Sequence, residues 1–307
     1  MKGNLGFGIF SVATVGLMSL WAGAQIPPIP ATTQRSIEQI IGTAGTYAAD
    51  ESVFKIRIPR NDIVLTLHGH RVPPKFPMES WVGFSPEIRG GGLMMGELQL
   101  LEEEVDSVAS AALDAGLDIN GLANTAAFDQ PRLLTMNIVG TGSFDKLAGA
   151  IRKSLDALSA VHGKQQSPAM LPLPKTNAID AGPIDAILSM KGTITNGVYR
   201  AAIGQISVLN NTPFGKEMGA STSVVFLGSN TDALLQGQIV CTTEQLQRIL
   251  KSLRSRNLNL ISIRNHTVGE HPQLVFVRFS GRGSAKTLAN SVRFVLDAQV
   301  GNIRPAA

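Results

Sequence analysis

The second half of this chain repeats the first, and that repetition limits the possible folds more than any other feature. Shifting the sequence by 141 residues lays residues 258–283 over residues 117–142 without a gap. Both segments keep an Asn, an acid, a Pro and two glycines in matching places: Asn124 and Asn265, Asp129 and Glu270, Pro131 and Pro272, Gly140 and Gly281, Gly142 and Gly283. Residues 36–58 and 183–203 match in the same way at an offset near 146. The chain is therefore predicted to contain two copies of one folding unit.

Each copy shows the sequence signals of helices and of a hairpin between them. The helix expected after residue 242 has apolar residues three and four apart, and Thr242 and Gln245 have capping-box spacing before it. Glu102, Glu103 and Glu104 open the matching helix of the first copy, where acids suit the positive end of the helix dipole. After each hairpin a serine, Ser143 or Ser284, stands at the predicted N-cap of an amphipathic helix.

These signals predict an α+β fold built by tandem duplication. Each copy should form an antiparallel sheet with helices packed on one face, close to a split βαβ core. Residues 96–160 should superpose on residues 237–301, because the offset is constant across them.

The ends and the middle of the chain have distinct compositions. Residues 1–24 resemble a secretory signal peptide, with Lys2, an apolar run and a small-residue site, which predicts a periplasmic or secreted protein without stable membrane insertion after cleavage. A transmembrane anchor is the alternative. Residues 25–160 are then the first repeat, residues 161–182 a Pro-rich linker and residues 183–307 the second repeat. With Cys241 as its single cysteine, the chain cannot form an internal disulfide, and Cys241 is predicted to be a buried apolar residue.

The charge distribution bears on possible partners. Residues 33–160 carry a net charge of −5 and residues 180–300 a net charge of +5, so the overall +4 hides two halves of opposite sign. Such halves can attract each other, and they lack the continuous basic face that nucleic acid requires. We expect no nucleic-acid partner.

The second hairpin carries the candidate ligand-binding residues. Strand alternation predicts a core face and an opposite face. The core face takes Ile261, Ile263, Val275, Val277 and Phe279, and the other takes Ser262, Arg264, His266, Phe276, Arg278 and Ser280. Two arginines held close together could grip one anion. We therefore name Arg264, His266, Glu270, His271 and Arg278 as candidates, with an ordinary solvated polar face as the alternative.

Metal chemistry is a second possibility for this hairpin. His266, Glu270 and His271 form an alternative set of metal ligands, but they lie in a loop with Gly and Pro and lack the helical geometry of zinc-protease motifs. His68 and His70 flank a glycine, a pattern more typical of a hairpin turn. No motif assigns a reaction, so the interpretation favours binding over catalysis, and any cofactor remains unassigned.

The sequence also resembles a known family of proteins. The similarity is carried by VFKIRIPRNDI, VPP, a Trp-containing strand, GELQL before a helix and RNHTVGEHPQLVFVRFSGRG before an amphipathic helix. In these segments the chain is similar to the LppY/LpqO family of exported bacterial proteins. The resemblance covers nearly the whole chain after residue 24, in both copies. That family has no settled activity, so the resemblance implies an architecture and export rather than a reaction.

The family hairpin implies a metal site that this chain has largely lost. Its pattern is H-N-H, then G-E-x-P, then a third His on the returning strand. Those three His positions hold Arg264, His266 and Arg278 in the second copy and Ala123, Thr125 and Asn137 in the first. Because arginine cannot lose its proton to bind a cation, the second hairpin should bind an anion or nothing, and the first should be inert.

Three functions follow from these observations. The first is an exported module that binds a small polar or anionic ligand through the second hairpin. The others are a metal-binding protein or metal-dependent enzyme, and a non-catalytic interaction protein of the cell envelope.

Overall fold

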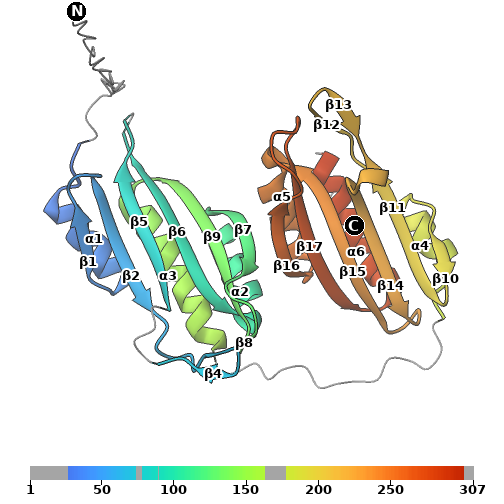
Figure 1. Cartoon of the computed structure of the whole chain (residues 1–307), viewed down its shortest axis with the longest axis horizontal. Helices are drawn as coiled ribbons and strands as arrows, with labels where there is room; N and C mark the ends of the chain where they lie inside the picture. The colour runs from blue at the N-terminus through green and yellow to red at the C-terminus, as the bar shows by residue number, and fades with distance from the viewer. Residues whose placement is uncertain (1–26, 74–77, 89, 163–177, 301–307) are drawn as a thin grey trace, which may run out of the picture.

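The two halves of the molecule share one sheet whose strand order is the same from either end. The computed structural model describes residues 27–73, 78–88, 90–162 and 178–300, so the predicted signal peptide and most of the predicted linker lie outside it. The described residues form a 12-stranded sheet in the order β1-β2-β5-β6-β9-β7-β16-β17-β15-β14-β11-β10, with every adjacent pair antiparallel (Figure 1). The first six strands belong to one repeat and the last six to the other, in mirrored order.

The α-helices and the strands of the large sheet correspond one to one between the two repeats, whereas the short elements outside that sheet differ. The first repeat contains α1 (Ala31–Ile41), β1 (Gly45–Ala48), β2 (Val53–Pro59), β3 (Thr66–Leu67), β4 (His70–Arg71), β5 (Glu79–Pro86), β6 (Gly92–Leu101), α2 (Glu102–Asp114), β7 (Asp118–Asn124), β8 (Asp129–Gln130), β9 (Leu133–Gly142) and α3 (Phe144–Val161). The second contains α4 (Ala181–Leu188), β10 (Thr193–Thr195), β11 (Val198–Gly204), β12 (Ser207–Leu209), β13 (Thr212–Phe214), the 3-10 turn η1 (Lys216–Met218), β14 (Ser221–Gly228), β15 (Ala233–Thr242), α5 (Thr243–Ser255), β16 (Asn259–Asn265), β17 (Leu274–Gly283) and α6 (Ala285–Val300).

Strand pairing confirms the duplication residue by residue. In the first repeat β6 pairs with β9 from Gly92 opposite Gly142 onward, and in the second β15 pairs with β17 from Ala233 opposite Gly283, each 141 residues later. A β-bulge also recurs, after Ile119 in β7 and after Leu260 in β16. The predicted α+β tandem fold is therefore confirmed.

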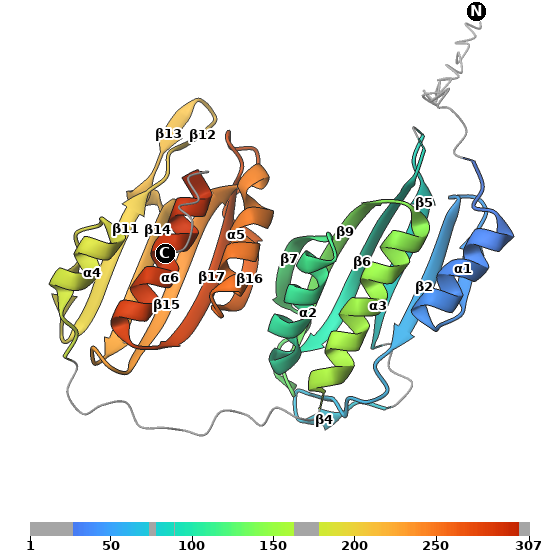
Figure 2. The ribbon, with the colours of Figure 1, turned by 180° about the vertical axis from the view of Figure 1, so that it is seen from behind.

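The six α-helices of the described residues lie on one face of the sheet, as predicted (Figure 2). They enclose the main apolar core, to which α5 contributes the predicted stripe and the strands contribute one side chain in two. The stripe is Leu246, Ile249, Leu250 and Leu253. Cys241 belongs to this core with no exposed surface, and burial raises the pKa of its thiol to about 12, which confirms its predicted apolar role. In the described part of the chain, no helix is long and apolar enough to cross a membrane.

We call the opposite face of the sheet the open face, because its middle is left uncovered. Each repeat covers part of this face with a short arm. In the second repeat the arm is β12, β13 and η1, residues 207–218, and it shields a small cluster that includes Phe214 and Phe276. In the first repeat residues 60–73 do the same over Leu101 and Leu133. Within residues 63–67, strand β3 is limited to Thr66–Leu67, because Ile63 and Leu65 pack into that cluster instead of joining a ladder. His68 and Gly69 form the predicted hairpin turn, both with positive φ.

Strand alternation is correct for most of the second hairpin and wrong at Ile261. Ile263, Val275, Val277 and Phe279 lie in the main core, whereas Ile261 is 38% exposed. The bulge after Leu260 adds one residue to β16, so Leu260 takes the core position and Ile261 turns outward.

Helix caps follow the sequence in the second repeat more closely than in the first. The backbone N–H of Thr242 donates to Gln245 Oε1 over 3.0 Å, as capping-box spacing predicts. Ser284 Oγ accepts from the N–H of Thr287 before α6, whereas Ser143 is the N-cap residue of α3 without a side-chain cap bond.

The repeats meet through equivalent strands, β7 and β16, which pair antiparallel where Leu122 lies opposite Ile263. Two matching side chains support this junction. Asp106 Oδ1 accepts from the N–H of Leu260 over 2.9 Å, and Gln247 Oε1, which is 141 residues after Asp106, accepts from the N–H of Ile119 over 2.9 Å. Arg254 also pairs with Asp106 over 2.9 Å, so opposite charges meet at the junction.

Candidate functional site

The candidate arginines lie on the open face of the second repeat. In the β16–β17 ladder Arg278 is opposite Ser262, and Arg264 is opposite Phe276, so the two arginines occupy diagonal positions. Diagonal neighbours on one face are about 7–8 Å apart between Cα atoms, which two guanidinium groups can bridge to one small anion. Both side chains are exposed.

Neither arginine is neutralised by a carboxylate of the described chain. The side chain of Arg278 has no hydrogen bond or ion pair with a described residue, and the Arg264 side chain donates to the backbone oxygen of Asn265 over 3.2 Å. Arg282, further along the same face of β17, differs because it forms a two-bond ion pair with Asp232, each bond 2.9 Å long. Arg264 and Arg278 thus keep donors available for a ligand.

His266 lies near the two arginines, just after the end of β16, but its side chain contacts the arm. Its Nε2 is 3.1 Å from the backbone oxygen of Met218, and its ring packs on the ring of Phe276 with centroids 4.8 Å apart. The Arg264 guanidinium lies 5.1 Å from the same ring centroid, a cation–π distance. Phe276 is therefore the common floor beneath Arg264 and His266.

Glu270 and His271 lie in the loop before β17, and their surroundings differ from those of the two arginines. Glu270 is 1% exposed; its Oε1 accepts from the N–H of Leu274 over 3.2 Å, and its Oε2 has no hydrogen-bond partner. Asp129 makes the equivalent bond to Leu133 in the first repeat. His271 pairs through its backbone with Val208 of the arm.

The structure does not gather the five candidates into one site. No hydrogen bond, ion pair or ring contact joins Glu270 or His271 to either arginine within the described residues. It also does not bring the alternative metal ligands together. Among the described residues, ligand atoms within 4.8 Å of one another come from Asp62, Glu104 and His162, not from His266, Glu270 and His271.

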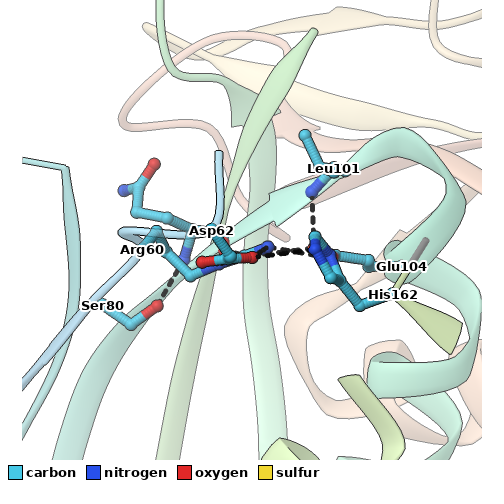
Figure 3. A network of polar contacts seen from close by, with 7 residues as sticks. Arg60, Asp62, Ser80, Leu101, Glu104 and His162 are labelled. Carbon is cyan, nitrogen blue, oxygen red and sulfur yellow. Dashed lines mark hydrogen bonds and ion pairs between the residues drawn. The ribbon is translucent and has the colours of Figure 1, made fainter. Parts of the chain in front are cut away.

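A buried charged cluster in the first repeat was not predicted from the sequence (Figure 3). Arg60, 4% exposed, donates to both carboxylate oxygens of Glu104 over 2.9 and 2.8 Å and to Asp62 over 2.9 Å. His162 at the end of α3 lies 2.9 Å from Glu104 and 3.4 Å from Asp62. Glu104 Oε2 also accepts from the N–H of Leu101, which makes it the counterpart of the cap residue Gln245.

The charges in this cluster already compensate one another. Burial disfavours the charged Asp62 carboxylate, but the hydrogen bonds and charge of Arg60 outweigh burial, so the pKa of Asp62 lies below its usual range. A cation bound by Asp62, Glu104 and His162 would have to displace the Arg60 guanidinium from both carboxylates. The cluster borders a cleft of about 380 Å³, yet its donors and acceptors are used internally. We therefore interpret it as a structural support joining β2, α2 and α3.

The first hairpin lacks the features of the second. At the position of His266 it has Thr125, which bonds to Gln99 over 2.9 Å and to Thr135, the counterpart of Phe276, over 2.8 Å. Gln99 also donates to Thr135, closing a small polar triad. The position of Arg278 is held by Asn137, so this face carries neither the arginine pair nor the aromatic floor.

The fold and these sites define a tandem α+β repeat protein with two halves in one sheet and a basic, partly apolar surface on the second half. The chain belongs to the family described as Domain of Unknown Function (DUF1259), whose model matches twice, over residues 35–157 and 182–298. No curated protein matches the chain. A solved structure titled as a trimeric bacterial microcompartment shell protein, PduB, matches over 84% of this chain and 94% of its own, with 10% identity. Its TM-score of 0.19 is too low to relate the two folds. The resemblance to LppY/LpqO proteins stays a prediction.

Proposed function

We propose that this protein is an exported module that binds a small anionic ligand on the open face of its second repeat. The observation that carries the proposal is the diagonal pair Arg264 and Arg278, exposed on one sheet face and free of any described carboxylate. The net charge of +5 over residues 180–300 adds long-range attraction for an anion. Asn137 at the Arg278 position of the first repeat predicts that binding is confined to the second.

The arginine pair can be tested against a control on the same strand. We expect inorganic phosphate and acetate to bind the purified protein saturably at low ionic strength. Replacing Arg264 and Arg278 together by alanine should weaken binding at least about tenfold, because each charged hydrogen bond contributes roughly 1.5–3 kcal/mol. Arg282→Ala should change binding little, since Asp232 already neutralises that guanidinium. Isothermal titration measures the affinities, and circular dichroism checks the fold of each variant.

Two results would contradict this proposal. One is equal binding by the wild type and the double variant, or no saturable binding of either anion. The other is stoichiometric zinc, copper or iron that copurifies with the wild type and disappears in His266→Ala, which would favour the metal-binding alternative.

Export is the second part of the proposal, and it rests on residues 1–24 and on the resemblance to LppY/LpqO proteins. The positive Lys2, the apolar run and the small residues before Gln25 have the order of a cleavable secretory signal. Mass spectrometry of the protein recovered from its native cells should show a chain that begins near Gln25 in the periplasmic or secreted fraction. Recovery of uncleaved chain from membranes would contradict it.

A further inference from the structure

We infer that the anion bound by this protein carries an apolar body, and that the ligand is a small amphipathic carboxylate. The inference rests on the proposed anion site and adds a second, apolar half to it. The second half is a pocket of about 280 Å³ between the arm and the loop of the second hairpin, lined by Leu209, Asn210, Thr212, Phe214, Met218, His266 and Thr267. Its volume is close to the lower limit of about 300 Å³ for ligand pockets, which suits one ring or a short acyl chain.

The pocket lies next to the arginine pair along β16. His266 lines the pocket, and Arg264 is two residues earlier on β16, about 7 Å away at 3.3–3.4 Å per residue. Both side chains lie against the Phe276 ring, so the guanidinium and the pocket residue His266 share an apolar neighbour. A ligand with its apolar body beside His266 can thus place a carboxylate at Arg264, with Arg278 on the diagonal.

Exposed apolar side chains mark the same place. Met218, which lines the pocket, is 66% exposed, and Val268, next to Thr267 in the loop, is 80% exposed. Apolar groups left open to water around a pocket favour an apolar occupant, and methionine adapts its shape to such ligands. In the first repeat, the polar triad of Gln99, Thr125 and Thr135 occupies the corresponding positions and offers no such floor.

The charges near the pocket favour a carboxylate over a neutral polar head. The pocket lining contains no acidic residue, and the nearest charged groups on the β16–β17 ladder are the two arginines. Two guanidinium groups match the paired oxygens of a carboxylate in geometry and charge.

The test compares three probes, acetate, octanoate and octanol, below micelle-forming concentrations. Octanoate should bind at least about tenfold more tightly than acetate, because each buried methylene adds affinity. Thr212→Trp, at an exposed strand position that lines the pocket, should remove this advantage while leaving acetate binding unchanged. Thr195→Trp, the same change on the exposed edge strand β10, is the matched control and should have no effect. Octanol should bind more weakly than octanoate.

The outcomes separate this inference from the proposed function. Equal affinity for acetate and octanoate, with both lost in the Arg264→Ala/Arg278→Ala variant, would overturn the apolar half and keep the anion site. Tight octanoate binding that survives removal of both arginines would overturn the two-part site. The absence of arginine-dependent binding for every probe would overturn the proposed function itself.

Discussion

Replacing Glu104 by alanine should lower the free energy of unfolding of the first repeat by about 3–5 kcal/mol, the usual cost of leaving a buried ion pair without one partner. Glu104 has no exposed surface, and its loss leaves the buried Arg60 with Asp62 as its one carboxylate partner and the N–H of Leu101 without its acceptor. Urea denaturation measures the change. In a chain that starts at Gln25, the fluorescence of Trp81 reports on the first repeat, because the other tryptophan is Trp21.

Two variants separate the ion pair from the helix cap. Glu104→Gln keeps an oxygen for Leu101, as Gln245 does for Thr242, and should cost less than Glu104→Ala. Gln245→Ala removes the cap in the second repeat and one hydrogen bond to the backbone oxygen of Gln299, but no charge, and should cost about 1 kcal/mol. If Glu104→Ala costs no more than Gln245→Ala, the buried charges do not stabilise the fold.

Replacing Phe279 by alanine should destabilise the second repeat by about 3–5 kcal/mol, the range for removing a buried phenylalanine. Its ring is fully buried and lies against the bare backbone of Gly237; a Cβ added there would be 2.2 Å from Phe279 Cζ. Small neighbouring groups cannot refill a space shaped for a ring, so a cavity remains. Hydrogen exchange of the β15 and β17 amides, together with urea denaturation followed by circular dichroism, measures the effect.

The first repeat supplies the control for this change. Ile138 occupies the position equivalent to Phe279 and lies opposite Gly96, the counterpart of Gly237. Phe279→Ile should therefore cost clearly less than Phe279→Ala, because it keeps most of the buried volume. Equal losses for the two variants would show that the ring is not closely packed against Gly237.

The sequence predicts those features that depend on local periodicity or on the repeat itself. The α5 stripe, the hairpins and the placement of the helices on one face follow from spacing and from the constant offset. The predicted core position of Ile261 is wrong because one extra residue in a strand reverses the alternation of its side chains. A bulge cannot be recognised from the pattern of apolar residues alone. Pairing of β7 with β16 joins two copies, and no periodicity within either copy encodes it.

In the candidate site, too, the sequence predicts the features that depend on neighbouring residues and not those that depend on distant ones. Alternation correctly places Arg264 and Arg278 on one face, since only neighbouring residues decide it. Burial of Phe276 on that face comes from the arm, whose two strands of three residues each are too short for a recognisable pattern. In the Arg60 cluster, Glu104 lies 44 positions from Arg60 and 58 positions from His162. Glu104 alone gave a partial signal, through its place in the first turn of a helix.

The pairing of β7 with β16 makes this chain equivalent to a symmetric dimer whose subunits cannot be diluted apart. A single repeat would present β7 as a self-complementary edge, and its assembly would depend on protein concentration. Joining the copies in one polypeptide holds the partner at an effective concentration in the millimolar range. The two halves can also differ in sequence, whereas the subunits of a symmetric homodimer are identical. One half can therefore hold Arg278 where the other holds Asn137, a specialisation that no homodimer of a single gene product could reach.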